Sequence, residues 1–109
     1  MRLLPVLSLM LCSLTASAAF AAPPTAAETQ DLARSKACLN CHQIDHKVIG
    51  PAFKDVARRY RGQKGAEQQL VAKVLQGGQG AWGPAAMPAN RQVNEAQARQ
   101  IVRWVLSQP

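Results

Sequence analysis

The chain has 109 residues, of which 48% are hydrophobic, and this length predicts one small domain. Its formal net charge is +7, and few aromatic residues stand between its scattered lysines and arginines. Basic chains often bind nucleic acid, but the export signal described next argues against contact with a genome. Attraction to acidic protein partners is the better interpretation of the charge.

The first 21 residues have the pattern of a secretory signal peptide. Arg2 precedes the apolar run LLPVLSLMLCSL, which is too short to span a bilayer, and the small-residue stretch TASAAFAA follows. We expect cleavage after Ala21, which would remove Cys12 and leave a mature domain of residues 22–109. A retained membrane anchor is the alternative, and the shortness of the apolar run disfavours it.

Two helices are expected in the first half of the mature domain. Residues 28–37 carry acidic side chains early and basic side chains late, which is the order that the helix dipole favours. Gly50 and Pro51 then indicate a turn. Behind it, apolar residues recur from Phe53 to Tyr60 at the i, i+3, i+4, i+7 spacing of one helix face.

Two further helices are expected in the second half. Residues 66–76 form an apolar-periodic run that ends at a glycine pair, and Asn94 begins another run with Gln97 at the capping-box position. Between them, residues 77–92 (GGQGAWGPAAMPANRQ) contain four Gly and two Pro, which predicts a long irregular loop. No alternating strand pattern is visible, so the predicted fold is all-α with about four short helices.

The motif CLNCH, residues 38–42, is compatible with three chemistries. A zinc site would need all four ligands from one short loop, because only Cys38, Cys41, His42 and His46 are available. A redox disulfide pair would sit at a strand-to-helix junction, and no strand is predicted. A c-type haem explains each position: both thiols add to the haem vinyl groups, and His42 follows as the proximal iron ligand. We therefore predict one covalently attached haem c, with a chance occurrence of the motif as the remaining alternative.

The second axial ligand is predicted to be Met87. It is the only methionine of the mature chain, and prolines on both sides restrict the loop that carries it. A core methionine would more naturally lie on a helical stripe. His46 is a weaker candidate, because it follows His42 by only four residues and can hardly reach the opposite face of the ring.

From about residue 31 to residue 108, the chain resembles the small bacterial class I cytochromes c of the cytochrome c-551 family. The stretches that carry the resemblance are KACLNCH, IDHKVIGPAFKDVA, GQGAWGP, MPAN and IVRWVLSQ. The resemblance implies the class I cytochrome c fold, in which four short helices surround a low-spin haem with His and Met ligands. It also implies a role in carrying single electrons in the bacterial periplasm. We expect the protein to be a soluble monomer.

The same resemblance implies roles for residues around the haem. The Pro51 carbonyl would accept a hydrogen bond from the proximal imidazole, the Trp82 indole would donate to a haem propionate, and Asn90 would donate towards the methionine sulfur. Lys73 stands where the family often has an arginine near the propionates. Lysine keeps the positive charge there but cannot make the bidentate contact of an arginine. Phe53 replaces a frequent tyrosine, and we interpret it as a packing residue.

The predicted function is electron transfer without catalysis, since no nucleophile–base pair is evident. Redox proteins such as a nitrite reductase, a terminal oxidase, a peroxidase or a bc-type complex are compatible partners, and nucleic acid is not expected. The alternative is a five-coordinate haem c domain that binds a small gas or peroxide as a sensor or enzyme. That alternative requires that Met87 does not bind the iron.

Overall fold

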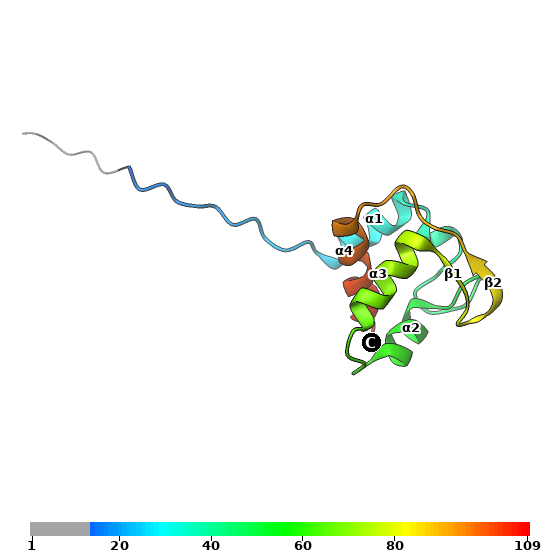
Figure 1. Cartoon of the computed structure of the whole chain (residues 1–109). Helices are drawn as coiled ribbons and strands as arrows, with labels where there is room; N and C mark the ends of the chain where they lie inside the picture. The colour runs from blue at the N-terminus through cyan, green and yellow to red at the C-terminus, as the bar shows by residue number, and fades with distance from the viewer. Residues whose placement is uncertain (1–13) are drawn as a thin grey trace, which may run out of the picture.

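The computed structural model describes residues 14–109. Most of the predicted signal peptide, including Cys12, therefore lies outside the described residues. Residues 14–24 form neither helix nor strand and run away from the folded domain as an exposed chain (Figure 1). None of the helices in residues 14–109 combines the length and apolar character that a bilayer crossing requires.

The domain contains the four predicted helices. They are α1 (Ala26–Ser35), α2 (Phe53–Tyr60), α3 (Ala66–Gln76) and α4 (Glu95–Leu106), and a short 3₁₀ helix, η1 (Cys38–Asn40), follows α1. The predicted fold class, all-α with about four short helices, is thus confirmed.

The first helix begins and ends two residues earlier than predicted, because its capping box lies upstream of the expected start. The Thr25 hydroxyl accepts a hydrogen bond from the Glu28 backbone N–H (3.2 Å), and the Glu28 carboxylate accepts one from the Thr25 backbone N–H (2.7 Å). The capping box expected for the last helix is present, formed by Asn94 and Gln97. Helix α3 ends at Gln76, and Gly77 is its C-cap with φ of 77°, in agreement with the predicted end at the glycine pair.

The loop predicted for residues 77–92 contains a small hairpin that the sequence analysis did not anticipate. Strands β1 (Gly78–Gly80) and β2 (Gly83–Met87) pair in antiparallel fashion, with Gly78 opposite Met87 and Gly80 opposite Gly83. Both strands are short and mostly exposed, so neither shows the alternation of apolar and polar residues that marks a half-buried strand. Figure 1 shows the hairpin at the edge of the domain, on the side away from the N-terminal segment.

Helix α4 is the centre of the core, since it packs on α1, α2 and α3. The apolar stripe of α4 is buried, and Trp104 of the same helix meets Phe53 edge-on at a ring-centroid distance of 5.4 Å. The stripe residues are Ala98, Ile101, Val102 and Val105.

An ion-pair cluster reinforces the contact between α3 and α4. The Glu67 carboxylate accepts hydrogen bonds from Arg103 Nε and Arg99 Nη1, both at 3.0 Å, and Arg99 Nη2 also donates to Glu95 (2.8 Å). The hydrogen bonds from Arg103 and then Arg99 hold the pKa of Glu67 below its usual value.

This cluster predicts a pH-dependent stability. Because the pKa of Glu67 is lower in the folded protein, its contribution is present above the unfolded pKa, near 4.5, and is lost as pH falls through the folded pKa. Glu67→Gln should lower the Tm of the haem-loaded protein by roughly 2–5 °C at pH 7. The gap to wild type should shrink on acidification below pH 4.5.

Thermal unfolding followed by circular dichroism at pH 7 and at pH 3 measures this difference. Glu95→Gln is the control, because the Glu95 carboxylate is largely exposed and meets Arg99 alone. An equal loss in both variants, or a gap that does not depend on pH, would contradict the assignment.

Candidate functional site

A cavity of about 460 Å³ lies between the CLNCH segment, helices α2 to α4 and the hairpin. Its walls are mostly apolar and include Val56, Val74, Ile101, Val102 and Val105 of the core. All eight residues that the sequence analysis assigned to the site line this one cavity. They are Cys38, Cys41, His42, Pro51, Lys73, Trp82, Met87 and Asn90.

A tight turn brings the cysteines and the histidine of CLNCH to one wall of the cavity. Ala37 adopts a left-handed conformation with φ of 65°, and η1 follows directly. The backbone N–H groups of Cys41 and His42 then both donate to the Cys38 carbonyl, at 3.3 and 3.1 Å. Cys38 and Cys41 are not joined by a disulfide. Burial raises the pKa of the Cys38 thiol, which keeps the unattached sulfur neutral.

The imidazole of His42 is held from three sides. Its Nδ1 lies 2.8 Å from the Pro51 carbonyl oxygen, which can only accept, so in the neutral ring Nδ1 carries the proton and Nε2 has the free lone pair. The ring stacks on Phe53 at a centroid distance of 5.1 Å and an interplanar angle of 20°. A Cβ atom at Gly50 would overlap the ring, so the backbone passes there at a distance that only glycine allows.

Met87 reaches the same cavity from the far end of β2. The chain that follows it is docked on α3, because the Asn90 backbone N–H donates to the Val74 carbonyl (2.8 Å). At Gly77, a Cβ atom would lie 2.7 Å from the Met87 carbonyl oxygen and 2.8 Å from the Ala89 nitrogen. The end of α3 therefore fits closely against the segment that carries Met87.

The Asn90 side chain joins two segments of the site. Its Nδ2 donates to the Lys36 carbonyl (2.8 Å), and its Oδ1 accepts from the Gln92 backbone N–H (3.0 Å). The first bond connects the end of the hairpin to the segment just before CLNCH. One of the two N–H groups on Nδ2 remains for the donation towards Met87 that the family resemblance implies.

Trp82 and Lys73 border the cavity from the hairpin and from α3. The Lys73 side chain runs along Gly78, where an added Cβ atom would lie 2.6 Å from its ammonium nitrogen. The Trp82 side chain, 37% exposed, stacks beneath the Arg59 guanidinium. Arg59 was not predicted as a site residue, and no local pattern indicates a contact across 23 positions.

His46, the weaker ligand candidate, is exposed, pairs with Asp45 and lies outside the cavity lining.

The residues present fit the haem c that the motif predicts. Two thiols and an imidazole with one free nitrogen share one wall, a thioether comes from a separate segment, and the remaining walls are largely apolar. Sulfur and imidazole nitrogen are the ligands that haem iron accepts.

Comparison with known proteins gives a consistent result. The cytochrome c family profile matches residues 26–109. Cytochrome c-551 of Pseudomonas aeruginosa is 46% identical over 83 residues, which cover 76% of this chain and 79% of that protein. Cytochrome c2 of Rhodocyclus tenuis is 49% identical over 86 residues, which cover 74% of this chain and 92% of that protein.

Solved structures agree with this result. The crystal structure of wild-type Nitrosomonas europaea cytochrome c552 superposes with a TM-score of 0.71 at 39% identity, over 73% of this chain and 99% of that one. Neither these structures nor the sequence relatives support the five-coordinate sensor or enzyme alternative. The chain therefore belongs to the cytochrome c family, as a carrier of single electrons with one covalently bound haem c.

Proposed function

We propose that Cys38 and Cys41 hold the haem by thioether bonds and that His42 and Met87 are its two axial ligands. When bound, the haem iron accepts and releases one electron, and two protein ligands suit this task because the coordination barely changes between the two states. The observation that carries the proposal is the convergence of both thiols, the imidazole and the thioether on one cavity, although Met87 lies 45 residues beyond His42.

The surroundings of His42 support its role as a ligand. Donation from Nδ1 to the Pro51 carbonyl orients the ring and raises the basicity of Nε2. Phe53 stacks against one face of the ring, and Trp104 packs edge-on against Phe53. A ligand whose second nitrogen and ring face are both occupied can move little when the charge on the iron changes.

The apolar walls and the methionine would both favour the reduced state. Methionine as the second ligand raises the potential relative to histidine. Burial among residues such as Val56, Ile101 and Val102 excludes water and disfavours the additional positive charge of the oxidised iron.

The cavity rim is where a redox partner would approach. Ile49 is 56% exposed, and Ala85 and Ala86 of β2 are exposed beside Met87, so the rim offers a small apolar surface. A weak interface, below about 1,200 Å², would permit rapid docking and release. We propose redox proteins such as a nitrite reductase, a terminal oxidase, a peroxidase or a bc-type complex as partners, and no catalysis by this chain itself.

We also propose a signal peptide of residues 1–21 and a mature domain of residues 22–109 in the periplasm. The fold supports this division, because the first helix begins at Ala26 and the family match begins at the same residue. The expected cleavage point after Ala21 lies in the exposed segment that precedes them.

Replacing the proposed ligand should change both spectrum and potential. Met87→Ala should abolish the near-infrared sulfur–iron band of the oxidised protein and lower the reduction potential by on the order of 100 mV, because the thioether no longer stabilises the reduced iron. Absorption spectroscopy and redox titration measure the two effects. His46→Ala is the matched control and should leave both unchanged; a loss of the band in this control, or its persistence in Met87→Ala, would refute the ligand assignment.

Gly50 offers a test of the His42 environment. In Gly50→Ala the new methyl group must displace the imidazole or the backbone, so the free energy of unfolding should fall by about 1–3 kcal/mol. The reduction potential should shift as well. Denaturant unfolding and redox titration measure these effects, with Gly62→Ala as the control, because that site strains the backbone (φ of 75°) but touches nothing within 4 Å. A potential shift of the same size in Gly62→Ala would contradict the role of Gly50.

A further inference from the structure

Arg59, on the last turn of α2, makes two contacts with the turn of the hairpin. Its guanidinium carbon lies 4.5 Å from the centroid of the Trp82 ring, within the range of a cation–π interaction. Its Nη1 donates a hydrogen bond to the Ala81 carbonyl at 2.6 Å. Because the planar guanidinium can stack and donate at the same time, one side chain holds both residues of the turn.

These contacts stand out against the few others that the hairpin makes. Within the described residues, the bond from Arg59 to Ala81 is the one hydrogen bond between residues 78–88 and a segment outside the hairpin. The side-chain bond from Gln79 to Pro84 lies within the hairpin. The base of the hairpin is anchored by the residues that flank it, through the close packing at Gly77 and the hydrogen bond from Asn90 to Val74. The turn is thus tied to the body of the protein by Arg59, and the base by its chain connections.

The position of the turn matters for the site. Trp82, in the turn, and Met87, at the end of β2, both line the cavity. Four residues of chain separate them, and all four belong to β2. A displacement of the turn would therefore move the strand that ends at Met87.

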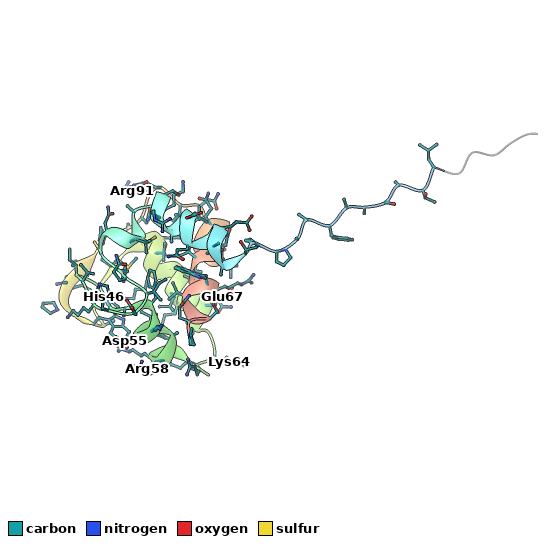
Figure 2. The ribbon with its side chains drawn as sticks, turned by 180° about the vertical axis from the view of Figure 1, so that it is seen from behind. His46, Asp55, Arg58, Lys64, Glu67 and Arg91 are labelled. Carbon is teal, nitrogen blue, oxygen red and sulfur yellow. The ribbon has the colours of Figure 1, made fainter. Side chains whose placement is uncertain are left out.

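A helix-dipole effect explains part of this arrangement but not all of it. Arg58 and Arg59 both occupy the last turn of α2, where a positive charge is favourable. Arg58 pairs with Asp55 at 2.9 Å and is well exposed (Figure 2). Arg59 lies 5.9 Å from the ring of its neighbour Tyr60 and closer to that of Trp82. Only Arg59 reaches the hairpin, so Arg58 is a charge-matched control for it.

We propose that Arg59 is a positioning residue that pins the hairpin turn to α2 and so holds Met87 against replacement by competing iron ligands. The inference rests on the proposed ligation by Met87. An external ligand can replace Met87 only when the hairpin moves away, and this movement breaks the contacts with Trp82 and Ala81. The equilibrium constant for opening therefore contains the free energy of those contacts.

The test uses the oxidised, haem-loaded protein and imidazole as the probe. At pH 8 imidazole is largely neutral. Removing one positive charge from the protein therefore does not change the electrostatic attraction between the protein and the probe. We expect Arg59→Gln to bind imidazole about three- to tenfold more tightly than wild type, because opening costs less. Arg58→Gln should stay within about twofold of wild type, and Arg59→Lys should fall between, since lysine keeps the charge but loses the planar stack.

A second measurement separates positioning from a change in the iron itself. Hydrogen exchange of the β1 and β2 amides should be faster in Arg59→Gln than in Arg58→Gln, while exchange in α4 stays the same in both. Equal imidazole affinities in the two glutamine variants, or unchanged exchange in the hairpin, would overturn the positioning role. If wild type lacks the sulfur–iron band, the ligand assignment fails; if the band is present and Arg59→Gln behaves as wild type, only the role of Arg59 fails.

Discussion

The hydrogen bond between His42 Nδ1 and the Pro51 carbonyl is the constraint on which most of the site depends. Together with the hydrogen bond from the Gly50 N–H to the Cys41 carbonyl (2.8 Å), it closes the segment after CLNCH, so that the backbone at Gly50 passes against the imidazole and α2 begins directly behind it. Phe53, the first residue of α2, then stacks on the His42 ring and also contacts Trp104 in the core. These contacts connect the orientation of the proposed ligand to the packing of α2 on α4.

The core and the cavity share their walls, which couples folding to haem binding. Val56, Val74, Ile101, Val102 and Val105 belong to the apolar core and also line the cavity. A domain of this size buries only a modest fraction of its surface, so a large apolar group in its centre adds substantially to its stability. A cofactor that binds only the native state shifts the folding equilibrium towards that state, and the covalent thioether bonds would make the shift permanent.

The two proposed ligands are supported in different ways. His42 lies in a segment with several backbone hydrogen bonds and is enclosed by Pro51, Phe53 and Gly50. Met87 lies at the end of an exposed two-stranded hairpin, and two-stranded hairpins have little stability of their own. Its position therefore depends on contacts at both ends of the hairpin: Asn90 with Val74 and Lys36 at the base, and Arg59 with the turn. The less stable side of the site is thus the side on which ligand exchange would occur.

The sequence by itself determined the helices, the motif and the candidate ligands of this protein. Helix periodicity, the cap at Asn94 and the spacing of CLNCH are local features, and residues a few positions apart suffice to show them. The hairpin was missed because its short, exposed strands carry no alternating pattern. Only the tertiary structure decided that Gly50 lies against His42, that Asn90 bonds the Lys36 carbonyl and that Arg59 stacks on Trp82. The physical reason is that such contacts depend on where separate segments meet in space, which packing of the whole core sets and local periodicity does not record.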